Sequence, residues 1–75
     1  MLELRERLMT ILEEDNTIID LNEDLEYVLV KHTLSGEAFF FEGDDYKMLY
    51  NSYLNSGISD EFYFIEYLYL VSQNW

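Results

Sequence analysis

The chain of 75 residues contains no cysteine, so neither a disulfide framework nor a thiolate metal site can help to hold it folded. It has no proline and only three glycines, and nothing in it resembles a linker, a repeat or a low-complexity tract. A chain this short lies near the lower limit at which a hydrophobic core alone keeps a protein folded. We therefore expect one acidic domain spanning residues 1–75 that depends on its apolar core.

Positive charge is scarce, with four lysines and arginines against 16 aspartates and glutamates. The formal net charge of −12 exceeds the roughly 2–8 charges that suffice to keep a small domain soluble. Such a chain repels nucleic acid and anionic membranes and is steered toward basic surfaces. The strongest basic surfaces in a cell hold DNA or RNA, so we expect a basic DNA-binding protein as the partner.

Long apolar runs are also missing. The most apolar stretch, FYFIEYLYLV at 62–71, includes Glu66 and falls far short of the ~20 residues that cross a bilayer. The opening MLELRERLM is charged throughout and has no apolar segment typical of a signal peptide. We expect a cytoplasmic location.

What the chain does have is apolar and aromatic material, at 49% and 17% of its residues, which is too much for a disordered acidic tail. An apolar stripe with helical spacing predicts a helix over 3–14. The stripe consists of Leu4, Leu8, Ile11 and Leu12. Three strand-like runs follow at 17–20, 25–33 and 37–42, which predicts a small antiparallel sheet.

Ser35-Gly36 has the composition of a two-residue hairpin turn between the second and third runs. That turn predicts three cross-strand pairs, namely Leu34 with Glu37, His32 with Phe39, and Val30 with Phe41. One face of the hairpin is then apolar and suits the core, with Val28, Val30, Phe39 and Phe41. The other face is mixed and carries Tyr27, Leu29, Lys31, Phe40 and Glu42.

After Gly43 the apolar period becomes helical. The stripe of the predicted helix consists of Tyr46, Leu49, Tyr50, Tyr53 and Leu54. We expect Asp44 as its N-cap, Asp45 in its first turn and Gly57 as its left-handed stop. The last segment is apolar on both faces and also suits a strand. Its start decides for a helix over 60–72, because Ile58 suits a staple residue and Ser59 an N-cap before two acids. The fold class is therefore α+β, with a two- to three-stranded antiparallel sheet packed with two or three helices in the order α-β-β-β-α-α.

No constellation predicts catalysis, a metal site or a cofactor, so we expect a non-enzymatic protein. A calcium-loop pattern begins at Asp20 but fails at Leu25 and Lys31, where glycine and glutamate are required. His32 is the only histidine, and we expect a hairpin residue beside Phe39. The two arginines of the first helix are expected to pair with acids of the same helix.

The acids form the most informative pattern. Seven carboxylates crowd residues 11–27, with no cation between Arg7 and Lys31. Carboxylates two apart on a strand lie roughly 6.6 Å apart, and helical ones three or four apart lie about 5–6 Å apart. Both spacings are near that of successive phosphates, so the acids suit DNA mimicry. The predicted partner-binding acids are Glu13, Glu14, Asp15, Asp20, Glu23, Asp24, Glu26, Asp44, Asp45, Asp60 and Glu61.

The aromatic residues exceed what so small a core can bury, and exposed aromatics beside acids suit a protein–protein interface. The candidates for an aromatic interface are Tyr27, Phe40, Tyr63, Tyr67, Tyr69 and Trp75. Self-association is one use for this surface, and we expect a homodimer.

In the segments EEDNTIIDLNEDLE, FEGDDY and EFYFIEYLYLV, the chain resembles small acidic phage-encoded DNA-mimic inhibitors. It is most similar to the staphylococcal-phage inhibitors of the bacterial DNA sliding clamp. The resemblance implies a dimeric inhibitor, acting in the host bacterial cytoplasm, whose acids occupy the DNA channel of the clamp and block DNA loading. The chain has no Q-x-x-L/M-x-F-like segment, which argues against docking in the polymerase-peptide pocket of the clamp.

Three alternatives remain open. Small anti-CRISPR proteins that mimic the PAM duplex are similarly acidic and share the order of one helix, three strands and two helices. Uracil-DNA glycosylase inhibitors present acids beside a hydrophobic pocket. A non-enzymatic dimerisation module, in which the acids only solubilise the chain, belongs to another class. Salt separates the classes, because mimicry demands an affinity that collapses as the salt concentration rises.

Overall fold

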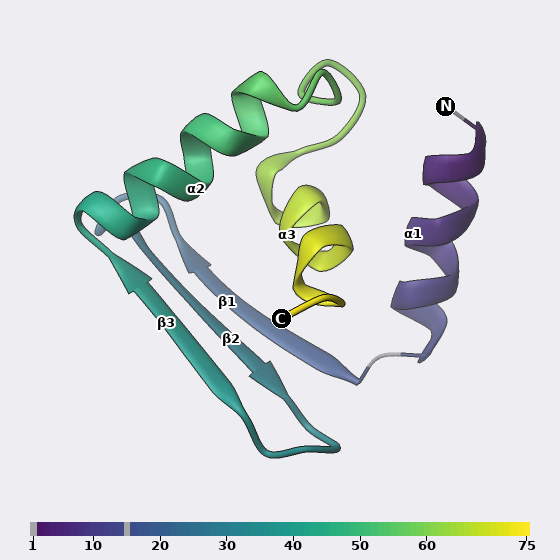
Figure 1. The fold of residues 1–75 in the computed structure, drawn as a ribbon, viewed down its shortest axis with the longest axis horizontal. Helices are drawn as coiled ribbons and strands as arrows, with labels where there is room; N and C mark the ends of the chain where they lie inside the picture. The colour runs from purple at the N-terminus through teal and green to yellow at the C-terminus, as the bar shows by residue number, and fades with distance from the viewer. Residues whose placement is uncertain (1, 15) are drawn as a thin grey trace.

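Three helices lie on one side of a three-stranded antiparallel sheet in the computed structural model, which describes residues 2–14 and 16–75 (Figure 1). The elements are α1 (Leu2–Glu14), β1 (Thr17–Asn22), β2 (Tyr27–His32), β3 (Ala38–Glu42), α2 (Asp44–Asn55) and α3 (Phe64–Ser72). The strand order is β1-β2-β3, so each strand pairs with its neighbour in sequence. This architecture confirms the α+β class and the predicted order α-β-β-β-α-α.

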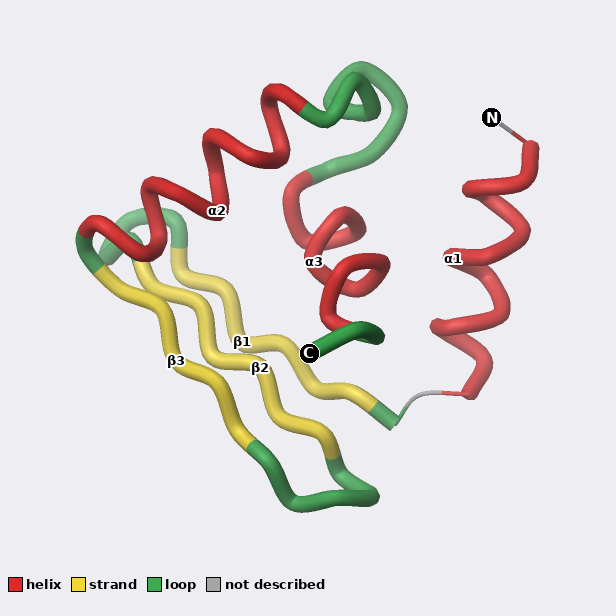
Figure 2. Tube along the Cα trace, in the orientation of Figure 1, coloured by secondary structure: helices red, strands yellow, loops and turns green. Residues whose placement is uncertain are grey.

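Helix α3 lies at the centre of the molecule, between the sheet and α1 (Figure 2). Phe64 and Leu68 are buried against the inner sheet face and α2. On the other side of α3, Leu70 packs with Leu8 and Phe62 in a second apolar cluster next to α1. A helix with neighbours on two sides must be apolar on both, because each contact removes side chains from water. The two-sided apolar pattern of this segment therefore reflects its central position.

The two faces of the sheet differ as the sequence predicted. On the inner face Val28 and Val30 are fully buried, and Phe39 and Phe41 are half-buried behind them. The outer face has no helix over it among the described residues, and Phe40 there is 53% exposed. The mixed composition of that face follows from its contact with water.

The predicted register of the β2–β3 hairpin is wrong by two residues. Val30 lies opposite Phe39, not Phe41. The backbone N–H of His32 donates to the Glu37 carbonyl at 2.8 Å, so residues 33–36 make the reversal. A two-residue turn at Ser35-Gly36 would need a positive φ at Ser35, whereas in this turn only Gly36 has one, at 77°. Because the side-chain period of a strand is two, the shift leaves every residue on its predicted face.

Both predicted N-caps are also wrong. Gly43, with φ 57°, caps α2, so Asp44 is the first residue inside the helix. Helix α3 begins at Phe64 rather than at residue 60, because the carbonyl of Ile58 accepts from the N–H groups of Glu61 and Phe62 and closes a separate turn. The Glu66 side chain then accepts from the N–H of Tyr63 at 2.8 Å at the true start of α3.

The remaining helix predictions are confirmed in part. Gly57 has the predicted left-handed conformation, with φ 83°, just after α2. Leu8 of the α1 stripe is buried, but Leu12 is 48% exposed. Within the described ranges, no helix combines the length and the apolarity that crossing a membrane requires.

Candidate acidic interface

Six exposed carboxylates gather at one end of the sheet, where the β1–β2 turn lies beside the start of α2 (Figure 1). The register explains the meeting, because Asn22, Tyr27 and Glu42 are directly opposite one another across the three strands. The turn after Asn22 and the junction after Glu42 must therefore leave the sheet at the same end. We call this cluster the acidic end, and it consists of Glu23, Asp24, Glu26, Glu42, Asp44 and Asp45.

The electrostatics of Tyr46 show that the two segments are close. Tyr46 lies in the first turn of α2, and burial is the main cause that raises the pKa of its phenol above 10.0. The carboxylates of Glu23 and Glu26 raise this pKa further, because a nearby negative charge disfavours the phenolate. The β1–β2 turn is thus near enough to α2 for its charges to act on that helix.

The β1–β2 turn places its acids in water by a local mechanism. The Asn22 side-chain oxygen accepts a 2.8 Å hydrogen bond from the N–H of Leu25, which closes the turn. Leu25 is 72% exposed at the tip of the turn, among the acids. Glu26 has a left-handed backbone with φ 54°, a conformation that costs a residue with a Cβ atom roughly 1–2 kcal/mol. The turn therefore keeps a carboxylate where glycine would be less strained.

The start of α2 offsets part of the repulsion between the carboxylates of the acidic end. Asp44 and Asp45 occupy the first turn of the helix, where the unsatisfied backbone N–H groups carry partial positive charge. An acid at this position gains about 0.3–1 kcal/mol at low salt. The helix dipole thus favours two of the six carboxylates at this end of the sheet.

Duplex DNA gives a scale for the number of charges that a DNA-binding surface receives. Three strands at a spacing of about 4.8 Å place their outer axes roughly 10 Å apart. Duplex DNA carries one charge per about 1.7 Å of its axis, or about six charges in the same 10 Å. The acidic end carries six carboxylates, the same number of charges as this length of duplex.

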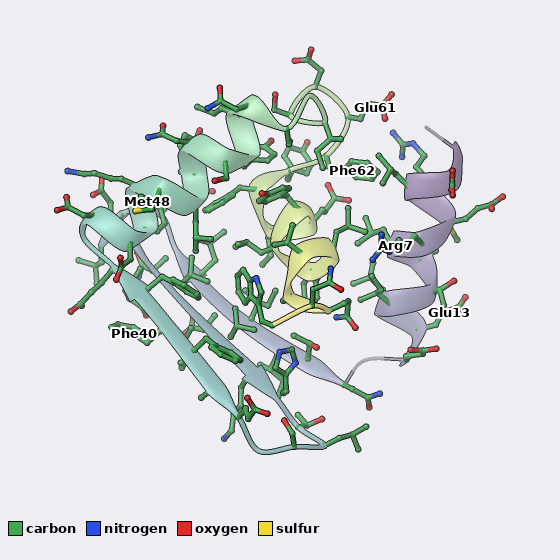
Figure 3. All side chains as sticks on the ribbon, viewed as in Figure 1. Arg7, Glu13, Phe40, Met48, Glu61 and Phe62 are labelled. Carbon is green, nitrogen blue, oxygen red and sulfur yellow. The ribbon has the colours of Figure 1, made fainter. Side chains whose placement is uncertain are left out.

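The other predicted acids lie elsewhere. Figure 3 shows Glu13 at the end of α1 and Glu61 in the connection between α2 and α3, both far from the acidic end. Each has its neighbour in sequence beside it, Glu14 and Asp60, and all four are exposed. Asp20 is exposed on the outer sheet face, and Asp15 lies outside the described residues. The eleven predicted acids therefore do not form one surface.

Glu42 is the member of the acidic end that the sequence pattern did not predict. It lies opposite Tyr27 at the end of β3, directly before the Gly43 reversal. The signal that identifies it is the register of the sheet, because only that places the β3–α2 junction beside the β1–β2 turn.

The candidate aromatic residues separate into two groups. Three of them pack against the core, namely Tyr67, Tyr69 and Trp75. The ring of Trp75 lies 5.0 Å from that of Phe41, on the inner side of the sheet. Tyr27 and Phe40 pair on the outer face with ring centroids 5.9 Å apart, and Tyr63 is 79% exposed near the start of α3. Only these last three offer much aromatic surface to a partner.

His32 and Arg5 pack against aromatic rings of the fold. His32 lies edge-on to Phe39 at 5.7 Å, as predicted, and its Nδ1 is 3.3 Å from the Thr17 hydroxyl. The guanidinium of Arg5 lies over the ring of Phe62 at 5.3 Å, a contact that connects α1 to the segment before α3. Within residues 2–14 and 16–75, no group of three or more histidine, aspartate or glutamate side chains is placed to hold a metal ion.

The acidic end thus offers a partner dense negative charge on two adjoining backbone reversals. Its acids come from segments 23–26 and 42–45, which only the sheet register and the start of α2 bring together. No family model, curated protein or solved structure matches this chain.

Proposed function

We propose that the protein is a DNA-mimicking inhibitor that binds the basic DNA-binding surface of a host protein. The favoured target is the DNA channel of the bacterial sliding clamp, which the resemblance to phage inhibitors suggests, and occupation of that channel blocks DNA loading. The observation that carries the proposal is the acidic end, where two backbone reversals bring six exposed carboxylates to the same end of the sheet.

The mechanism is electrostatic substitution. Lysine and arginine side chains that bind phosphates pair instead with the carboxylates of the acidic end, and DNA is excluded because both ligands need the same cations. Charges of one sign on one end of a small domain also steer it toward a basic surface and raise the association rate. No catalysis, metal or cofactor is required, and the inhibitor acts in the cytoplasm of the host.

One alternative target has a specific observation in its favour. The element order α-β-β-β-α-α, which small anti-CRISPR proteins share, is the order found in this chain. A PAM-reading surface is a second basic groove that the acidic end would fill by the same mechanism. The solubilising-module alternative receives no comparable support from the fold.

The test compares two variants with equal charge. The acidic-end variant combines Glu23→Gln, Asp24→Asn, Glu26→Gln and Glu42→Gln. The matched control removes four charges elsewhere and combines Glu13→Gln, Glu14→Gln, Asp60→Asn and Glu61→Gln. Each is titrated against a purified bacterial sliding clamp, and in parallel against guide-loaded Cas9, at low and at physiological salt. Circular dichroism checks that both variants fold.

We expect the acidic-end variant to lose at least about tenfold in affinity, mostly through a slower association rate, and the control to lose much less. The affinity of the parent protein for the target should fall steeply as the salt concentration rises, and duplex DNA should compete with the protein for the target. Equal losses in both variants would mean that only net charge matters. Unchanged binding by a folded acidic-end variant would refute mimicry through this surface.

A further inference from the structure

A shallow apolar groove runs between β3 and α2, next to the acidic end. It has a volume of about 190 Å³ and is lined by Phe41, Asp45, Met48, Leu49 and Ser52. Met48 is 67% exposed at the start of α2 (Figure 3). The groove therefore presents apolar side chains and one carboxylate to solvent, beside the most acidic part of the molecule.

The size of the groove excludes most kinds of ligand. Sites for small molecules and cofactors usually enclose about 300–1,000 Å³. A hollow of about 190 Å³ is too small for these, but its volume is large enough for a single side chain of a partner protein. Interfaces often place one such anchor in a pocket near the centre of the contact, and arginine is among the residues enriched there.

We propose that this groove receives an arginine side chain from the basic partner that the acidic end binds. The inference rests on the proposed function and deepens it, because it names the chemistry of one contact. The aliphatic stem of an arginine lies against Met48 and Leu49, and its guanidinium reaches the Asp45 carboxylate, with which it forms paired hydrogen bonds. Phe41 offers an aromatic surface to the same cation.

Two features of the groove select arginine over other side chains. A leucine or methionine would fill the apolar part but would cover Asp45 without satisfying it, and a desolvated charge without a partner is costly. Lysine brings a point charge that neither stacks on an aromatic ring nor matches a carboxylate with two donors. The wall that would receive the guanidinium is also held in place, since Trp75 packs on Phe41 at 5.0 Å.

The experiment uses three blocked tetrapeptides as probes, of arginine, lysine and citrulline, the last being a neutral analogue of arginine. The protein carries ¹³C-labelled methionine methyl groups and is titrated with each peptide at low salt by NMR. Met48 reports on the groove. Met9, which is 61% exposed on α1, is the internal control.

Two substitutions in α2 test the site. Ser52→Phe places a ring in the groove, whereas Leu54→Phe adds a similar ring about 200° around the same helix, since each residue advances about 100°. Asp45→Asn is a second groove variant that changes no volume. It keeps the inference testable if Ser52→Phe disturbs folding.

We expect tetra-arginine to shift the Met48 methyl signal and to leave Met9 unchanged. Tetra-lysine should bind at least about threefold more weakly at Met48, because it lacks the stacking and paired hydrogen bonds, and tetra-citrulline should not bind. Ser52→Phe and Asp45→Asn should each reduce the Met48 response at least about threefold, and Leu54→Phe should preserve it.

The outcomes distinguish this inference from the proposed function. If tetra-arginine leaves the Met48 methyl signal unchanged, or if tetra-lysine binds as tightly as tetra-arginine at Met48, the groove does not receive arginine. That result leaves the acidic end as a DNA mimic intact. If Met48 responds as expected but the acidic-end variant binds the clamp and Cas9 as tightly as the parent, the proposed function fails and the groove still binds arginine.

Discussion

The phenol of Tyr53 donates a hydrogen bond to the backbone carbonyl of Phe62 and so joins the middle of α2 to the segment before α3. Tyr53 belongs to the apolar cluster beneath the sheet, and Phe62 belongs to the cluster between α1 and α3. The carbonyl of Ser59 lies 3.2 Å from the same phenol oxygen. One buried hydroxyl therefore fixes the turn that separates the two halves of the core.

Removal of that hydroxyl should destabilise the fold. Tyr53→Phe leaves the buried Phe62 carbonyl without its donor, which costs about 1–3 kcal/mol of unfolding free energy. Tyr50→Phe is the matched control on the same helix, because Tyr50 is 39% exposed, and its cost should stay within about 0.5 kcal/mol. Urea unfolding measures both values. Equal stabilities of the two variants would contradict the role of the hydrogen bond.

Alkaline pH should unfold the protein. Burial is the main cause that raises the pKa of Tyr46, Tyr53 and Tyr67 above 10.0. In the unfolded chain these phenols ionise near their ordinary pKa, so above pH ~10 the unfolded state binds fewer protons than the native state. Their contribution is therefore complete below pH ~10 and is lost as the pH rises through the folded-state pKa values. Unfolding free energies measured from pH 8 to 12 should fall, and phenolate absorbance should appear together with unfolding.

Salt should stabilise the protein. With a formal charge of −12, repulsion between distant acids acts over the Debye length, which falls from about 30 Å at 0.01 M to about 10 Å at 0.1 M. We expect the Tm to rise between these two conditions. The acidic-end variant should start from a higher Tm and gain less from salt. A flat curve for the parent would mean that the acids are locally compensated.

Relief of strain at the β1–β2 turn should stabilise the fold. Glu26→Gly removes the Cβ atom at φ 54° and one charge, and we expect a gain of about 0.5–1 kcal/mol. Glu26→Gln removes only the charge and keeps the strain, so it separates the two effects. If both variants have the stability of the parent, the left-handed conformation carries no cost in this turn.

Self-association should use the outer face of the sheet. Tyr67, Tyr69 and Trp75 pack against the core, whereas Phe40 stands 53% exposed beside Tyr27 on that face. We propose a homodimer in which two chains of −12 each place −24 on one particle, enough to occupy a wide basic channel. Sedimentation should show a dimer at micromolar concentration for the parent and a monomer for Phe40→Thr. Tyr63→Thr, at an aromatic that is 79% exposed elsewhere, should leave the dimer intact. A parent that sediments only as a monomer would refute this proposal.

The amino-acid sequence by itself determined the class of the fold, the order of its elements and the faces of its strands. These follow from local periodicity, which depends on the spacing of apolar residues and little on their partners. The inner position of Val28 and Phe41 was predictable for this reason. This prediction of the inner face holds although the predicted register is wrong, because the register differs by an even number of residues.

Tertiary structure decided the start of α3 and the composition of the acidic end. Ser59 has the chemistry of an N-cap, yet burial of Phe62 and its hydrogen bond to Tyr53 give a separate turn there, because those contacts outweigh a local capping preference. Glu42 joins Glu23 because β1 and β3 flank the same strand, across nineteen positions of the chain. Charge is visible in a sequence, but its density on a surface depends on which segments the sheet brings together.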